Sequence, residues 1–287
     1  MKRRRVAVVI HAYYENILDE IFICLNNFRK VCGNAAIMFL TYPKDNRSIA
    51  KKVCLEFPDI NLIPVENVGY DIGPFFRVLS EINLDNFDYV VKLHTKRDKT
   101  IDWVNFHCFR NGEWRHSLMS FCNTQSALEC SLLSFEKDPK LGMIADRKVI
   151  DPSGVGQGCY REWLNLRVLR ELGYSPETNT FVYGTMFMMR AEILKGVQGR
   201  VRFSDFSPVL NPHMDYGLAL EWELAFPVLV EVNGYRVSDK EIIGWGYPIW
   251  FYFRKVKLTI IRYAIDFIRL IIGTKRINWI LKRVGLR

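Results

Sequence analysis

The chain has 287 residues, 49% of them hydrophobic, which supports a packed core and favours one large α/β domain. Seven scattered cysteines with no Cys-x-x-Cys pair argue against a disulfide framework or a zinc site and favour a reducing cytoplasm. The five apolar residues after the basic start are too few for a secretion signal. Residues 248–287 hold ten Lys/Arg and one Asp, so the whole net charge of +9 lies in the tail.

Apolar runs alternate with helical patterns through the first hundred residues. We expect strands over residues 6–10, 35–40, 62–65 and 89–93, and helices over residues 17–28, 48–57 and 75–82 between them. Such steps predict a Rossmann-like domain with a mostly parallel sheet. Ligands of open parallel sheets bind just beyond the carboxyl ends of the strands.

Polar and aromatic residues follow the first and third of these strands. His11 and Tyr13 stand where a nucleotide base and ribose would stack, although a core-edge aromatic and a loop histidine are the structural alternative. Asn67, Gly69 and Asp71 form a turn in which Asp71 could simply cap the next helix. Their clustering favours a binding loop in which Asp71 holds ribose or sugar hydroxyls.

The fourth strand ends in Lys92, His94, Thr95 and Lys96. Residues 92 and 94 alternate along a strand, so both side chains point to one face. The cations would neutralise charge on a departing diphosphate, and the alternative is a solvated basic loop.

The second half of the chain is less regular. Residues 103–118 are aromatic and basic and suggest an acceptor-side flap or helix, with Trp103 and Arg110 as contacts. Further on we expect a helix over 126–135, a strand over 142–145, a glycine-rich candidate lid over 151–158 and a strand over 181–190. Gly184 and Thr185 interrupt that last strand, where small residues let an acceptor approach the backbone.

A helix over residues 215–226 and a final strand over 228–232 complete the predicted domain, residues 1–244. Glu221 lies on an otherwise apolar face of that helix, so its carboxylate either has a partner or is functional.

The tail, residues 245–287, has too short an apolar run for a spanning helix. Lys and Arg surround an apolar stripe, which predicts a basic amphipathic helix on an anionic membrane surface. The alternatives are a helix packed on the domain and a nucleic-acid patch, and we expect no nucleic acid. The stripe consists of Trp250, Phe253, Ile260, Ile261, Ala264, Ile265, Ile268 and Ile272.

Three motifs together resemble the rhamnan synthesis protein F family of bacterial polysaccharide assembly: residues 67–75 (NVGYDIGPF), 92–96 (KLHTK) and 184–187 (GTMF). The opening strand with His11 and Tyr14 also fits, and the resemblance covers residues 6–232. It implies a GT-A-like glycosyltransferase with a nucleotide-sugar donor such as dTDP-rhamnose or a UDP-sugar. The implied acceptor is a lipid-linked cell-surface polysaccharide, lipopolysaccharide or O-antigen. The enzyme would be peripheral on the inner face of the plasma membrane, beside other polysaccharide-assembly enzymes.

Two departures from the family pattern bear on the site. The family often shows His-Ala-Leu-Glu-Arg, and residues 218–222 (LALEW) keep only Glu221. GT-A enzymes commonly hold a metal with Asp-x-Asp after the fourth strand, which residues 92–96 lack. We therefore assign no metal ligand, although Asp71 or Asp98 could recruit Mg²⁺ or Mn²⁺.

The resemblance and the residues together suggest roles. Donor binding is assigned to His11, Tyr13, Asn67, Gly69, Asp71, Lys92, His94, Thr95 and Lys96, acceptor binding to Trp103, Arg110, Gly184 and Thr185, and catalysis to Glu221 and Asp71. The alternative is a non-catalytic scaffold of a polysaccharide-assembly complex.

Overall fold

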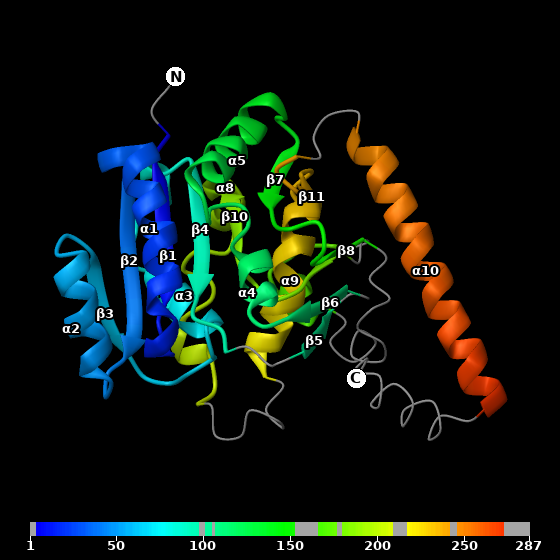
Figure 1. The fold of residues 1–287 in the computed structure, drawn as a ribbon, viewed down its shortest axis with the longest axis horizontal. Coiled ribbons are helices and arrows are strands. Elements are labelled where there is room, and N and C mark those ends of the chain that lie inside the picture. The colour runs from blue at the N-terminus through cyan, green and yellow to red at the C-terminus, as the bar shows by residue number, and fades with distance from the viewer. Residues whose placement is uncertain are drawn as a thin grey trace.

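The computed structural model describes residues 4–97, 101–104, 107–152, 166–176, 180–208, 217–241 and 246–272. Its central sheet contains β1 (Val6–His11), β2 (Ala36–Pro43), β3 (Asn61–Val65), β4 (Tyr89–His94), β7 (Leu141–Ile144), β10 (Phe187–Arg190) and β11 (Arg236–Ser238). The strand order is β11-β7-β10-β4-β1-β2-β3 (Figure 1). Only β10 runs antiparallel to its neighbours, so the predicted α/β class with a mostly parallel sheet is confirmed.

The helices are α1 (Leu18–Cys32), α2 (Arg47–Glu56), α3 (Ile72–Leu79), α4 (Glu113–Leu118), α5 (Gln125–Lys137), α7 (Arg167–Glu171), α8 (Ala191–Lys195), α9 (Leu218–Val232) and α10 (Gly246–Ile272). Short 3-10 turns cover Glu15–Ile17, Gly33–Ala35, Leu84–Asn86 and Phe203–Asp205. Among the described residues, two small antiparallel sheets lie outside the main sheet: β5 (Ile101–Val104) pairs with β6 (His107–Arg110), and β8 (Ile150–Asp151) pairs with β9 (Phe181–Val182).

Helices cover both faces of the sheet, which explains why every residue of β1 and β4 is buried. On one face, the ring of Phe75 in α3 lies 6.1 Å from Phe187 in β10 and 5.6 Å from Phe226 in α9. On the other face, Tyr89 in β4 packs 4.6 Å from Phe135 in α5. Residues 89 and 92 of β4 face opposite sides, so the polar residues at positions 92 and 94 share the α3–α9 side.

Two predicted strands are wrong in detail. Residues 228–232 continue α9 through Pro227 to Val232, and the last strand is β11 instead. A short buried apolar run has no period that separates a strand from a helix, and Pro227 falsely suggested a helix end. The strand expected over 181–190 is two strands, because Gly184 and Thr185 take positive φ values of 83° and 51° between them.

The aromatic segment 103–118 forms the β5–β6 hairpin followed by α4, not a single flap or helix. Residues 153–158 of the expected lid, and Asp98, lie outside the described residues.

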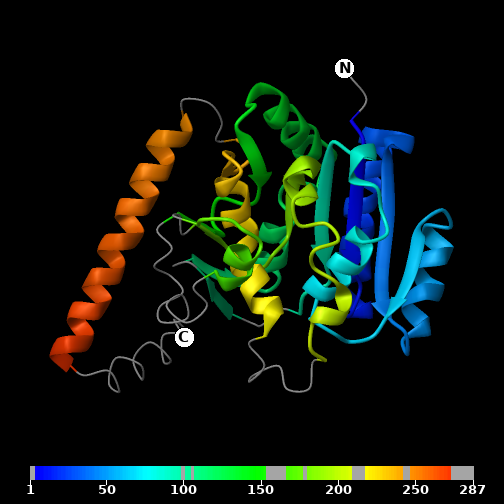
Figure 2. The same ribbon diagram turned by 180° about the vertical axis from the view of Figure 1, so that it is seen from behind.

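Helix α10 stands off the body of the domain along one side (Figures 1 and 2). Its first turns touch the domain, where Trp250 packs against the core. Within the described part of the chain, no helix is long and apolar enough to cross a membrane. The predicted stripe is therefore divided, because Trp250 faces the domain whereas Phe253, Ile260 and Ile268 are exposed. The division at residue 244 stays a prediction.

Candidate functional site at the carboxyl ends of β1 and β4

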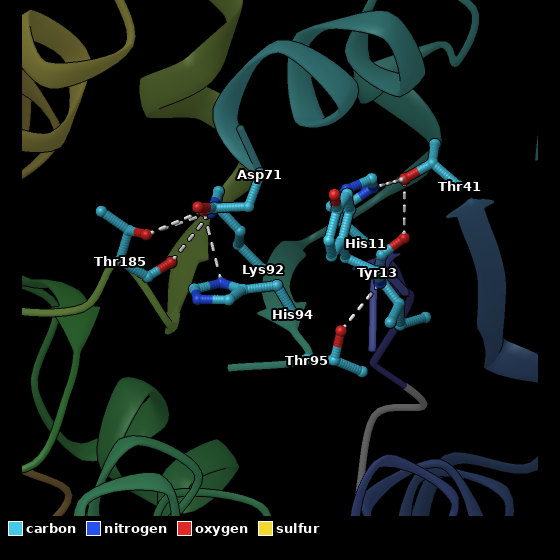
Figure 3. A network of polar contacts seen from close by, with 9 residues as sticks. His11, Tyr13, Thr41, Asp71, Lys92, His94, Thr95 and Thr185 are labelled. Atoms are coloured by element: carbon cyan, nitrogen blue, oxygen red, sulfur yellow. Dashed lines mark hydrogen bonds and ion pairs between the residues drawn. The ribbon is translucent and has the colours of Figure 1, made fainter. Parts of the chain in front are cut away.

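Three adjacent parallel strands pair in register, so that Thr41, His11 and His94 lie side by side across β2, β1 and β4. The Thr41 hydroxyl donates to the carbonyl of Ile10 at 3.0 Å, and His11 Nδ1 lies 3.0 Å from the hydroxyl oxygen of Thr41 (Figure 3). Since that hydroxyl has one proton, Nδ1 of His11 must donate and its Nε2 is an acceptor. Burial lowers the pKa of His11 to about 4, so the ring is neutral at pH 7.

Thr95 fastens the loop after β1 to the end of β4. Its Oγ1 accepts a hydrogen bond from the backbone N–H of Tyr13 at 2.8 Å (Figure 3). It accepts a second from the backbone N–H of Tyr14 at 2.9 Å. Its own N–H donates to the carbonyl of His11 at 3.0 Å. Thr95 is buried, so it positions the loop, whereas Tyr13 is 40% exposed and accessible to a ligand.

Asp71 is the centre of the site. It occupies the N-cap position of α3, but its side chain makes no capping hydrogen bond. Its Oδ2 instead contacts Lys92 Nζ, accepts a hydrogen bond from Thr185 Oγ1 at 2.9 Å and lies 3.3 Å from His94 Nδ1 (Figure 3). The cap explanation for Asp71 is thus wrong, and the expectation that residues 92 and 94 point to one face is confirmed.

Burial sets the charges in this cluster. Burial would raise the pKa of Asp71, but the charge that His94 carries in acid and the charge of Lys92 outweigh it and hold that pKa below its usual range. Burial lowers the pKa of Lys92, which Asp71 opposes, and lowers the pKa of His94 well below its usual value. Asp71 and Lys92 therefore form a charged pair beside a neutral His94, whose Nδ1 makes no well-formed hydrogen bond to a described residue.

The pairing changes the role expected for Lys92. Its side chain is 1% exposed, against 21% for Asp71. Its ammonium also donates to the Thr185 carbonyl at 3.2 Å. Lys92 therefore neutralises Asp71 inside the domain, and a direct contact of Lys92 with a diphosphate stays a prediction. Lys96 is only partly buried and remains the candidate cation.

The loop that carries Asp71 depends on Gly69. Gly69 has φ 66°, and a Cβ there would lie 2.7 Å from the ring of Phe206. Its N–H donates to the carbonyl of Ser207 at 3.1 Å. Gly69 is therefore a packing residue, whereas Asn67 in the same loop is exposed.

Sequence reasoning missed Glu223 in α9. It is partly buried, and its carboxylate accepts a hydrogen bond from the backbone N–H of Gly184. Burial raises the pKa of Glu223; the charge of Lys96 opposes this and that of Asp71 reinforces it. Glu223 therefore belongs to the electrostatic environment of the Asp71 cluster.

Glu221, the predicted base, has a different setting. Residues two apart on an α-helix point about 200° apart, so Glu221 and Glu223 face different directions. Glu221 pairs with Arg167 of α7 at 2.8 Å. The spacing of the two acids was visible in the sequence, but the direction in which α9 presents them was not.

The residues assigned to the acceptor fall into two groups. Gly184 and Thr185 join the Asp71 cluster through Glu223 and Asp71. Trp103 and Arg110 lie on the β5–β6 hairpin, where Arg110 is exposed. The acceptor roles of this second pair stay predictions.

The side chains around Asp71 do not suit the coordination of a divalent cation. Among the described residues, no group of three or more His, Cys, Asp or Glu side chains could hold a metal ion. At Asp71 itself, Oδ2 already contacts an ammonium, which repels a second cation. Lys92 thus stands where a cation would bind.

The rhamnan synthesis protein F family matches residues 1–207. The chain belongs to this family. The match contains β1, β4, the Asp71 loop and Thr185, and it ends before α9, so both glutamates lie beyond it. Membership in a rhamnan synthesis family supports a glycosyltransferase-like role.

Two proteins named WxcX, from two strains of Xanthomonas campestris pv. campestris, are 26% identical to this family member over 238 residues. The aligned region is 82% of this chain and 32% of each relative, so the chain spans about a third of their length.

Solved structures superpose loosely. Mannosyltransferase PcManGT from Pyrobaculum calidifontis, in complex with GDP-Man and Mn²⁺, gives a TM-score of 0.42 at 16% identity and covers 94% of this chain and 65% of its own. A cytidylyltransferase from Leptospira borgpetersenii gives 0.38 at 11% identity, with 82% and 75% covered. Core-mannan synthase A from Aspergillus fumigatus gives 0.31 at 10% identity, with 79% and 68% covered. The family match alone carries the assignment.

Proposed function

We propose that this protein transfers a sugar from a nucleotide-diphosphate donor to a hydroxyl of a growing cell-surface polysaccharide. The observation that carries the proposal is the meeting of Asp71, His94 and Thr185 at the carboxyl ends of parallel strands, in a chain of the rhamnan synthesis protein F family. The donor would be dTDP-rhamnose or a UDP-sugar, and the acceptor a lipid-linked glycan such as a lipopolysaccharide precursor. The reaction would take place at the inner face of the plasma membrane.

The donor would lie along the ends of β1 and β4. The exposed ring of Tyr13 offers a stacking surface for the base, and Nε2 of His11 offers an acceptor. Asn67 and Asp71 would bind ribose or sugar hydroxyls. The partly buried Lys96 would neutralise charge on the leaving diphosphate.

Transfer also needs a group that accepts the proton of the attacking hydroxyl when configuration inverts. We assign this role to Glu223 rather than Glu221. Burial raises the pKa of Glu223, which makes its carboxylate a better base near neutral pH, and Gly184 fixes its orientation. Glu221 is paired with Arg167 instead.

Two measurements test this function. The first is a thermal-shift screen of the full chain against nucleotide sugars, with and without Mg²⁺ or Mn²⁺. One class of donor should bind the folded protein and raise its melting temperature. A transfer or donor-hydrolysis assay should then show turnover that Glu223→Gln lowers by about 10²–10⁴-fold. Glu221→Gln is the matched control two residues away and should keep most activity.

Each outcome decides between assignments. Loss of turnover in Glu221→Gln with full activity in Glu223→Gln would return the base to Glu221. Donor binding without any turnover would favour the scaffold of a polysaccharide-assembly complex. Absence of binding to every nucleotide sugar would refute the donor site.

A further inference from the structure

Helix α10 presents a long apolar face to solvent. Its exposed apolar and aromatic residues range from 36% exposed at Val256 to 83% at Leu270. They recur every three or four residues, so they share one side of the helix. We call this face the outer stripe; it consists of Ile249, Tyr252, Phe253, Val256, Ile260, Tyr263, Phe267, Leu270 and Ile271. A contiguous apolar surface of this length indicates a partner.

The domain holds α10 so that this stripe faces outward. The guanidinium of Arg254 donates to the carbonyls of Lys148 and Ile150 at 3.3 and 3.4 Å. The same group lies 3.3 Å from Nε2 of His107 in β6. Trp250, one turn earlier, packs against the core. These contacts fix the first turns of the helix and leave the rest projecting from the body (Figures 1 and 2).

One candidate partner is a second copy of the chain. Phe253, Ile260 and Phe267 alternate with Val256 and Tyr263 at the spacing of a coiled-coil seam. Stable coiled coils flank such a seam with charges of opposite sign. Here the flanking positions are Trp250, Tyr252, Lys257, Thr259, Ala264 and Asp266, which offer little charge complementarity along the seam. The pattern therefore does not favour a zipper.

A lipid surface fits better. Lys255 and Lys257 are exposed on the two sides of the outer stripe. Helix α10 contains five Lys/Arg against one Asp, and residues 273–287 add five more with no acid. Aromatic rings and lysine stems are suited to the boundary between headgroups and acyl chains. We propose that the outer stripe of α10 docks on the surface of an anionic bilayer.

This docking orients the site, a consequence that rests on the proposed function. In both views α10 runs in the same general sense as β1 and β4, so its last turns lie toward the carboxyl ends of those strands (Figures 1 and 2). A bilayer along the outer stripe would then extend toward the end of the domain that holds Asp71 and His94. A lipid-linked acceptor would then approach by lateral diffusion.

Vesicle flotation of the full chain tests the docking. Vesicles of phosphatidylcholine with phosphatidylglycerol should bind the protein, and phosphatidylcholine alone should bind it much less. Phe253→Ser with Phe267→Ser should weaken binding at least about tenfold. The matched control is Ile23→Ser with Leu55→Ser, which removes apolar side chains that are 55% and 77% exposed on α1 and α2.

Further variants and controls distinguish the effects of charge, of misfolding and of self-association on vesicle binding. Lys255→Glu with Lys257→Glu should weaken binding to the anionic vesicles while the melting temperature stays near that of the wild type. Equal flotation of the Phe253/Phe267 variant and the wild type would overturn the proposal. So would a wild-type dimer, without vesicles, that this variant converts to a monomer. The nucleotide-sugar thermal shift should persist in the variant, so failure of docking and failure of the donor site are told apart.

Discussion

The pair of Asp71 and Lys92 makes a quantitative prediction. Lys92 is 1% exposed and Asp71 is 21% exposed, so water can still reach one partner but not the other. Breaking a buried ion pair costs about 3–5 kcal/mol, mostly because the remaining charge stays buried without compensation. The two single substitutions should therefore have unequal effects.

Asp71→Asn leaves the ammonium of Lys92 buried and should lower the free energy of unfolding by about 5 kcal/mol. Lys92→Met leaves the carboxylate of Asp71 with partial hydration and the hydroxyl of Thr185, and should cost about 3 kcal/mol. The double variant buries no charge and should be more stable than Asp71→Asn alone. Since the double variant then costs less than about 5 kcal/mol, the coupling energy in this cycle should exceed about 3 kcal/mol.

Denaturant unfolding at several pH values measures the cycle. In Asp71→Asn, burial lowers the pKa of Lys92 in the folded state below its value of 10.5 in the unfolded chain, and the charge of Glu223 is left to oppose the shift. The unfolded state then binds more protons, so stability should rise as pH increases toward about 10. Additive single effects, or a larger loss for Lys92→Met, would refute the buried-pair reasoning.

Two further predictions concern the same edge of the sheet. Burial lowers the pKa of His11 from 6.5 in the unfolded chain to about 4, so its contribution is complete above pH 6.5 and lost as pH falls toward 4. His11→Gln should flatten that part of the stability curve, with His94 accounting for what remains; an unchanged slope would contradict the buried neutral ring. Gly69→Ala should cost about 2–4 kcal/mol from its positive φ and the clash with Phe206. Gly199→Ala, with φ 74° and no atom within 4 Å, should cost about 1 kcal/mol, and equal costs would exclude the clash.

Structural features that depend on the local sequence pattern were predictable. The buried runs that became β1 and β4, and the placement of residues 92 and 94 on one face, follow from period and length alone. The break at Gly184 and Thr185 was visible as a break, but its left-handed geometry was not. The strand predicted over residues 228–232 is wrong because an apolar run in a buried helix resembles a strand.

The site was only half predictable because its chemistry depends on distance and burial. The sequence placed Lys92 at the correct strand end but gave no sign that Asp71 would engage it. Glu223 went unassigned since α9 lies beyond the motifs, and only packing fixes which acid of that helix faces the cluster. In α10, the contacts that Trp250 and Arg254 make with the domain decide which side of the helix is exposed.

The choice between an enzyme and a scaffold can be argued from the stability that the domain loses by keeping the Asp71 cluster. Thr185 is β-branched and holds φ 51°, a strained conformation for such a residue. Lys92 carries a buried charge, and His94 leaves Nδ1 without a well-formed hydrogen bond among the described residues. Each feature lowers stability, and apolar residues of similar volume would often be at least as stable in place of a buried pair. Strain and charge retained together at a strand edge are typical of a site that must bind and react. A scaffold needs only the surface of the fold, so these features favour transfer over assembly alone.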